Sequence, residues 1–170
     1  MLVNNAGVTW GEPLDTYPEA GFDKVLHTNV KGPFLVTQAF LPLLRAAARP
    51  DDPARVVNVT SVEGHRVPTL ETYAYSASKA GANMLTRHLA LRLAGENITV
   101  NAIAPGPFES RMMAFLLDDP ETRARVASDC PIPRIGAPDD MAGAVIYLCS
   151  KASTYVTGSV LPVDGGLCAP

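Results

Sequence analysis

The chain has 170 residues, of which 47% are hydrophobic and 18% charged, and its formal net charge is −3. This composition is typical of an ordered globular chain of single-domain size, and the small negative charge disfavours nucleic acid or an anionic membrane surface as a partner. No apolar run reaches the roughly 18 residues that a membrane-spanning helix needs. No segment resembling a secretory signal begins the chain, so we expect a cytoplasmic protein.

Cys130, Cys149 and Cys168 are odd in number, far apart and without Cys-x-x-Cys spacing. Reduced cysteines are therefore predicted rather than a disulfide framework or a zinc site. The three histidines likewise lack the spacing of metal ligands, so no metal site is predicted.

Predicted strands and helices alternate along the chain. Apolar, β-branched runs predict strands at residues 1–3, 55–60, 98–103 and 159–163. Helices are predicted at residues 19–30, 33–48, 72–94, near 120–128 and at 138–149. Gly95 is the expected C-cap of the long helix, Pro42 is expected to kink its helix, and Pro105 is expected to break its strand. The alternation predicts an α/β doubly wound parallel sheet.

The chain begins inside the first predicted strand, with no edge or cap before it. We therefore expect residues 1–170 to form a single but truncated domain, whose incomplete sheet lacks its first strands. An uncovered edge on this strand would favour poor solubility or self-association.

The clearest chemical pattern is Tyr75-Ser76-Ala77-Ser78-Lys79 at the start of the long helix. A spacing of four places the phenol of Tyr75 and the ammonium of Lys79 on one helix face. A nearby cation favours the phenolate, so Lys79 is expected to lower the pKa of Tyr75 toward the working range of an acid or base. The alternative interpretation of this pair is an ordinary exposed tyrosine beside a solvated lysine. Tyr73 has no lysine at this spacing and is assigned to packing.

Ser61 lies at the carboxyl end of strand 55–60, where parallel sheets bind their ligands. Its hydroxyl could donate a hydrogen bond to a substrate carbonyl, although a serine in this place is more often a turn residue. Asn29 lies within a predicted helix, where asparagine usually points to solvent or marks a distortion. Because Gly32-Pro33 follows, a kink that turns the Asn29 backbone carbonyl toward the site is expected.

Two turns at strand ends complete the pattern. Asn4-Asn5-Ala6-Gly7 follows the first strand, where small residues would let a ribose or nicotinamide approach the backbone, although a plain turn is the alternative. Pro105-Gly106 leaves strand 98–103 sharply and is followed by Phe108 and Ser110.

These patterns occur in the order Asn-Asn-Ala-Gly, the helical Asn, Ser, Tyr-x-x-x-Lys and Pro-Gly. In this order they resemble the short-chain dehydrogenases/reductases. The resemblance covers the whole chain, including Val163-Asp164-Gly165-Gly166. The resemblance implies a Rossmann-type fold and an NAD(P)(H)-dependent oxidoreductase that interconverts a ketone and a secondary alcohol. It also implies a homo-oligomer, namely a tetramer, that packs through the helices containing Asn29 and Tyr75.

The resemblance implies a role for each matched residue. Tyr75 would exchange the proton with the substrate oxygen, Lys79 would hold the nicotinamide ribose, and Ser61 would polarise the carbonyl. Asn29 would hold a water that relays protons to Lys79. The implied cofactor contacts are Asn5, Ala6, Gly7, Tyr75, Lys79, Pro105, Gly106, Phe108 and Ser110.

Segments 4–11, 53–56 and 104–112 resemble more narrowly the 3-oxoacyl reductase type associated with rhamnolipid synthesis, which implies NADP as cofactor, with NAD as the alternative. The sequence departs from the family because no Gly-x-x-x-Gly-x-Gly loop occurs in the 170 residues. A chain without that loop is expected to bind the cofactor poorly. A catalytically inactive fragment or association module of the same family is therefore the alternative function.

Overall fold

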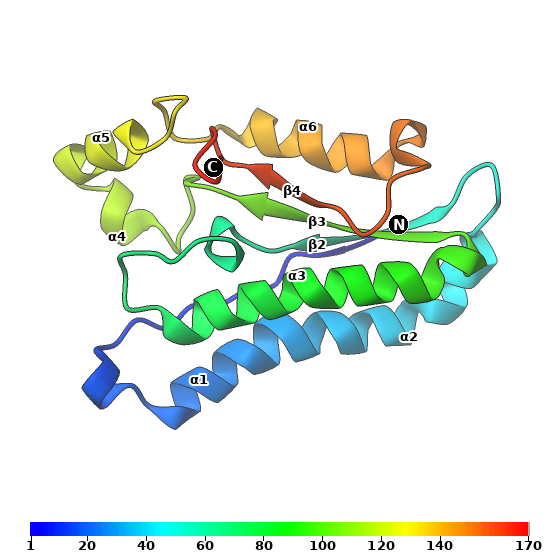
Figure 1. Ribbon diagram of the computed structural model, residues 1–170, viewed down its shortest axis with the longest axis horizontal. Coiled ribbons are helices and arrows are strands. Elements are labelled where there is room, and N and C mark those ends of the chain that lie inside the picture. Colours follow the sequence, from blue (N-terminus) through cyan, green and yellow to red (C-terminus); the bar gives the residue numbers. More distant parts are fainter. Residues whose placement is uncertain (170) are drawn as a thin grey trace.

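Four parallel strands form the sheet, in the order in which they occur along the chain. The structure is a computed structural model and describes residues 1–169. The strands are β1 (Leu2–Asn4), β2 (Ala54–Val59), β3 (Ile98–Pro105) and β4 (Val160–Val163). All of them point the same way in Figure 1, so their carboxyl ends share one edge of the sheet.

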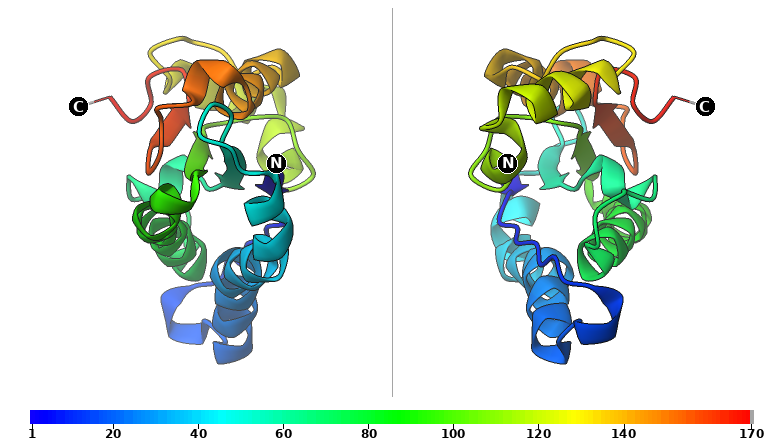
Figure 2. Two further views of the ribbon diagram at one scale, coloured as in Figure 1. Left: turned by 90° about the vertical axis from the view of Figure 1, so that its right-hand side faces the viewer. Right: turned by 90° about the vertical axis from the view of Figure 1, so that its left-hand side faces the viewer.

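Helices cover both faces of this sheet (Figures 1 and 2), with α2 and α3 against one face and α6 against the other. The α-helices are α1 (Glu19–Leu26), α2 (Gly32–Ala47), α3 (Tyr73–Leu93), α4 (Ala114–Leu117), α5 (Pro120–Ser128) and α6 (Pro138–Cys149). A π-helical segment, η2 (His27–Lys31), joins α1 to α2. Short 3-10 turns are η1 (Leu14–Thr16), η3 (Val62–Gly64), η4 (Ala94–Glu96) and η5 (Lys151–Ser153). The predicted α/β parallel sheet with helices on both faces is confirmed.

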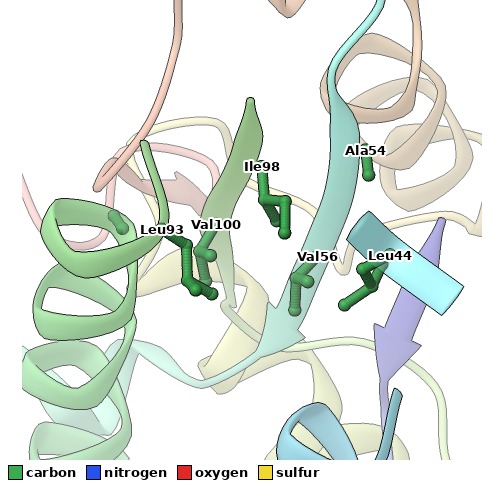
Figure 3. Close-up of a cluster of buried hydrophobic side chains, with 7 residues drawn as sticks. Leu44, Ala54, Val56, Leu93, Ile98 and Val100 are labelled. Atoms are coloured by element: carbon green, nitrogen blue, oxygen red, sulfur yellow. The ribbon is translucent and has the colours of Figure 1, made fainter. Parts of the chain in front are cut away.

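Two apolar clusters fill the space between these layers. The first lies between the sheet and helices α2 and α3, where Leu44, Val56, Leu93, Ile98 and Val100 pack together (Figure 3). The second lies on the α6 side and joins residues of β2 and β3 to the helix. Because successive strand residues point to opposite faces, most positions of β2 and β3 are apolar, as strands covered on both faces require.

The structure corrects several details of the predicted elements. Residues 19–47 form one continuous helical run with a π-helical segment, and α2 continues through Pro42 to Ala47. Strand β3 extends through Pro105, because a proline at the last position of a strand need not donate to the ladder. The short helix α4 was not predicted.

The predicted C-cap at Gly95 is wrong. Gly95 lies within the 3-10 turn η4, and the left-handed residue that ends the helical segment is Asn97, with φ 57°. Asparagine tolerates this conformation better than other residues with a Cβ atom.

Replacement of Ile98 by alanine is expected to lower the free energy of unfolding by about 2–5 kcal/mol. Ile98 is fully buried between the sheet and helices α2 and α3, so a shorter side chain leaves a cavity. Urea denaturation would measure the loss. Val67→Ala is the matched control, since Val67 is 89% exposed. Equal stability of the two variants would contradict the assigned core.

Candidate active site

A cleft of about 1050 Å³ opens at the carboxyl ends of the strands, the edge where parallel sheets bind ligands. Nine predicted site residues line it, namely Asn5, Gly7, Ser61, Tyr75, Lys79, Pro105, Gly106, Phe108 and Ser110. Ala6 and Asn29 are not among the lining residues. Ala6 is exposed at the turn that follows β1, and Asn29 is buried behind the cleft.

Tyr75 and Lys79 lie together in the first turns of α3, as their spacing predicts. The ammonium Nζ of Lys79 is 5.4 Å from the centre of the Tyr75 ring and donates a hydrogen bond to the backbone oxygen of Val59 at 3.0 Å. Only 5% of Lys79 is exposed. Within residues 1–169 no second acceptor bonds to its Nζ, so the ammonium keeps donors for a ligand in the cleft.

Burial controls the protonation of both groups. It raises the pKa of Tyr75, an effect that Glu63 strengthens and the neighbouring Ser61 partly offsets. Burial lowers the pKa of Lys79 to about 8, and the charge of Glu63 opposes this shift. The expectation that Lys79 lowers the pKa of Tyr75 is therefore not met here, because desolvation of the phenolate dominates. At neutral pH Tyr75 carries a proton that it can donate.

Tyr73, the neighbouring tyrosine, points away from this pair. Its ring packs edge-on against Tyr17 with the ring centres 5.6 Å apart, and its hydroxyl donates to Glu71. The assignment of Tyr73 to packing is confirmed.

Ser61 follows β2 in extended backbone conformation, with φ −169°, and is buried at the base of the cleft. Its Oγ accepts a hydrogen bond from the backbone N–H of Glu63 at 3.2 Å. Because this bond uses a lone pair of the oxygen, the hydroxyl hydrogen is still available to a substrate oxygen. The turn interpretation and the catalytic interpretation of Ser61 are thus compatible.

Asn29 lies in the π-helical segment, so the predicted distortion of the helix is confirmed. Its side chain does not reach solvent. The side-chain amide bonds to the backbone N–H and C=O of Val8, both at 2.9 Å, and donates to Oγ of Ser78 at 2.9 Å. Asn29 therefore fixes the turn after β1 against α3, on which Tyr75 and Lys79 lie.

A buried polar network that the sequence did not indicate supports the same region. The side-chain amide of Asn4 donates to Oγ1 of Thr37 at 3.1 Å and to Oδ1 of Asn58 at 2.8 Å. The amide of Asn58 in turn donates to Oγ1 of Thr86 at 2.8 Å. These bonds tie β1 and β2 to α2 and α3. Asn58, a polar residue between two valines of a predicted buried strand, was the available sign of this network in the sequence.

The loop after β3 is held by close backbone packing. A Cβ atom at Gly106 would lie 2.7 Å from Cα of Asp164, so only glycine fits between the ends of β3 and β4. The ring of Phe108 packs against Gly136, whose N–H donates to the backbone oxygen of Pro107 at 2.9 Å. The loop thus presents Phe108 and Ser110 to the cleft from a fixed position.

The outer part of the cleft has an apolar wall. Met112 and Met113 precede α4, Phe115 and Leu116 lie on it, and all four line the cleft. The sequence predicted no helix at residues 112–116, because α4 has only four residues and gives no periodic pattern.

Two classes of feature are absent from the part of the chain that the structure describes. None of its helices has the length and apolar character needed to cross a membrane. No cluster of three or more metal-ligating side chains occurs in residues 1–169.

Comparisons with known proteins show which proteins the chain is similar to. A family model described as enoyl-(acyl carrier protein) reductase matches residues 1–168. The chain is 45% identical over 166 residues to the rhamnolipids biosynthesis 3-oxoacyl-[acyl-carrier-protein] reductase of Pseudomonas aeruginosa, covering 98% of this chain and 65% of that protein. It is 40% identical to the Thermotoga maritima reductase FabG, again over 98% of this chain and 65% of that protein.

Solved structures show the same likeness. The Pseudomonas aeruginosa RhlG/NADP active-site complex superposes with a TM-score of 0.95 at 45% identity, covering 98% of this chain and 65% of that chain. A gluconate 5-dehydrogenase from Burkholderia cenocepacia in complex with NADP and tartrate gives a TM-score of 0.90 at 32% identity, over 99% and 64% of the two chains. The chain thus spans about two thirds, 64–65%, of the length of these relatives.

The stability of the chain is expected to rise with pH between about 8 and 10 because of Lys79. The folded-state pKa of about 8 lies below the ordinary 10.5, so in this window the unfolded chain binds more protons than the folded chain. The penalty for burying the ammonium is complete below about pH 8 and is relieved by deprotonation above it. By linkage the gain is about 2 kcal/mol.

Denaturant melts of the wild type and of Lys79→Met at pH 8 and pH 10 would measure this effect. The difference between the two proteins isolates Lys79 from the cysteines, whose raised pKa values also make stability depend on pH. A wild-type gain no larger than that of the variant would refute the buried-ammonium assignment.

Proposed function

Because the chain belongs to the short-chain dehydrogenase/reductase family, we propose that the protein is an NADP(H)-dependent oxidoreductase that interconverts a ketone and a secondary alcohol. The observation that carries the proposal is the meeting of Tyr75, Lys79 and Ser61 in one cleft at the carboxyl edge of the sheet. An association module would not need these three groups, so the enzyme is favoured over the fragment without activity.

In the proposed reduction Tyr75 donates its proton to the substrate oxygen. Its raised pKa keeps the phenol protonated at neutral pH, which suits an acid. Ser61 donates a hydrogen bond to the same oxygen and stabilises the charge that develops on it. Lys79 lies beside the ring and stabilises the phenolate that remains. In the reverse direction Tyr75 accepts the proton as a base.

The residues of the cleft fit a nicotinamide cofactor. Gly7 lies beside Lys79, since a Cβ atom at Gly7 would be 3.6 Å from Nζ, and Asn5 lines the same part of the cleft. We propose that Lys79 bonds to the ribose hydroxyls and that the loop at Phe108 and Ser110 faces the carboxamide. When bound, the cofactor supplies or accepts the hydride. Several NADP complexes among the similar structures support NADP over NAD.

Asn29 is proposed to serve the proton pathway. Its π-helical segment changes the backbone bonding pattern of the helix, and its side chain bonds to Ser78, the residue before Lys79. We propose that its backbone holds a water through which protons reach Lys79, while its side chain keeps the turn after β1 in place.

We propose a 3-oxoacyl thioester as the substrate. The apolar wall formed by Met112, Met113, Phe115 and Leu116 can contact an aliphatic chain beyond the reacting carbonyl. Two of the similar proteins are named as 3-oxoacyl-[acyl-carrier-protein] reductases, which supports this class.

A cytoplasmic homo-oligomer, namely a tetramer, is part of the proposal. Exposed apolar side chains on α2 and α3, among them Phe40 (42%), Leu43 (65%) and Met84 (60%), support assembly through these helices. The three cysteines are unpaired, as in a reducing compartment.

Replacement of Tyr75 by phenylalanine is expected to lower the turnover number for ketone reduction by about a hundredfold or more, because the proton donor is lost. Residues 1–170 contain no glycine-rich phosphate loop. The assay therefore joins the chain to the part of the Pseudomonas aeruginosa reductase that the match leaves uncovered. NADPH oxidation with a 3-oxoacyl thioester is followed at 340 nm. Tyr73→Phe is the matched control, and equal turnover of the two variants would remove Tyr75 from its assigned role.

Lysine and serine variants are expected to separate binding from chemistry. Lys79→Ala should weaken NADPH binding by about 1.5–3 kcal/mol, the contribution of a charge-assisted hydrogen bond, and should also lower turnover. Ser61→Ala should lower turnover while leaving the NADPH dissociation constant near that of the wild type. Calorimetric titration of the same joined protein would measure binding, with Lys31→Ala as control. An unchanged dissociation constant in Lys79→Ala would exclude the ribose contact.

A further inference from the structure

Glu63 has a place in the site that neither its sequence context nor the assigned roles explain. It lies in η3, two residues after Ser61, and lines the same cleft as Tyr75 and Lys79. One oxygen of its carboxylate, Oε2, accepts hydrogen bonds from Oγ1 of Thr72 at 2.9 Å and from Oγ of Ser76 at 3.1 Å. A carboxylate that accepts two hydroxyl bonds in a partly buried cleft is held in a defined position.

The two hydroxyls that hold Glu63 flank Tyr75 in the sequence. Thr72 immediately precedes α3, and its side chain makes no capping bond to the helix, because its hydroxyl is directed to Glu63. The carboxylate therefore lies near the positive end of a 21-residue helix, where negative charge is stabilising. On its other side the N–H of Glu63 donates to Oγ of Ser61.

These contacts form a continuous connection from Ser61 through Glu63 to the start of α3. We propose that Glu63 is a positioning residue that fixes the loop carrying Ser61 against the helix carrying Tyr75, and so sets the distance between the two groups that act on the substrate oxygen. This inference rests on the proposed function of Ser61 and Tyr75.

The charge of Glu63 acts on the same groups. Among the charged side chains of the described residues, it is the one whose field raises the pKa of both Tyr75 and Lys79. For Lys79 it opposes the effect of burial. Removal of the charge therefore lets the pKa of Lys79 fall further below about 8, and lowers that of Tyr75 as well. The position and the charge can be separated by substitution.

The test compares Glu63→Gln, which removes the charge and keeps an acceptor oxygen, with Ser76→Ala, which keeps the charge and removes one of its two hydroxyl partners. Glu71→Gln is the matched control, since Glu71 lies at the same helix end but is exposed and bonded to Tyr73. The pKa of Lys79 is measured by NMR of 13C-labelled lysine, assigned with Lys79→Met. Circular dichroism confirms that each variant is folded.

In Glu63→Gln the pKa of Lys79 is expected to fall, the pH profile of turnover to move to lower pH, and turnover to drop several-fold or more. Ser76→Ala should lower turnover with the pKa of Lys79 unchanged, and Glu71→Gln should match the wild type in every measurement. A Glu63→Gln protein with wild-type turnover and pH profile, or with an unchanged Lys79 pKa, would overturn the inference.

The NMR titration needs no enzymatic activity, so it tests the effect of Glu63 on Lys79 separately from the proposed function. If the joined protein reduces no ketone while the pKa of Lys79 still responds to Glu63→Gln, the proposed function fails and the link between Glu63 and Lys79 holds. If the wild type is active and Glu63→Gln changes neither measurement, the inference about Glu63 fails alone.

Discussion

The parallel pairing of β2 with β3 is the constraint on which the site depends. The two strands are in register from Ala54 opposite Ile98 to Val59 opposite Ile103, and both are covered on each face. Because their carboxyl ends are level, Ser61 and the loop that begins at Pro105 reach the same cleft. At the end of β2 the backbone oxygen of Val59 accepts a hydrogen bond from the Lys79 ammonium at 3.0 Å. The geometry of the proposed site thus follows from the register of the sheet.

Desolvation then decides how the groups in the cleft ionise. The sequence spacing of Tyr75 and Lys79 places the cation beside the phenol, and that part of the expectation is confirmed at 5.4 Å. The expected direction of the tyrosine shift is not confirmed. Burial disfavours both charged forms, so it raises the pKa of Tyr75 and lowers that of Lys79, and the two values move apart. A protonated phenol therefore lies beside a lysine that loses its proton at a lower pH than usual.

Local patterns predicted what depends on local structure. The strands, the long helix and the Tyr75–Lys79 pair follow from periodicity, and Ser61 from its place at a strand end. Patterns failed where the deciding partner is distant: the amide of Asn29 bonds to Val8 and Ser78, which lie 21 and 49 residues away. The sequence did not indicate a role for Glu63, because its two hydroxyl partners come from the start of α3. The prediction of a C-cap at Gly95 was wrong because glycine and asparagine can both end a helix, and the left-handed residue here is Asn97.

The π-helical segment between α1 and α2 determines how far the side chains of one helix are rotated relative to those of the other. A π-helical turn holds one residue more than an α-helical turn, and each residue advances an α-helix by about 100°. Deletion of one residue from this segment would therefore rotate the face of α1 relative to α2. Gly21, which now packs against the ring of Trp10, would turn away from it, and the buried side chain of Asn29 would be displaced. The extra residue thus sets the rotation of α1 relative to the cleft.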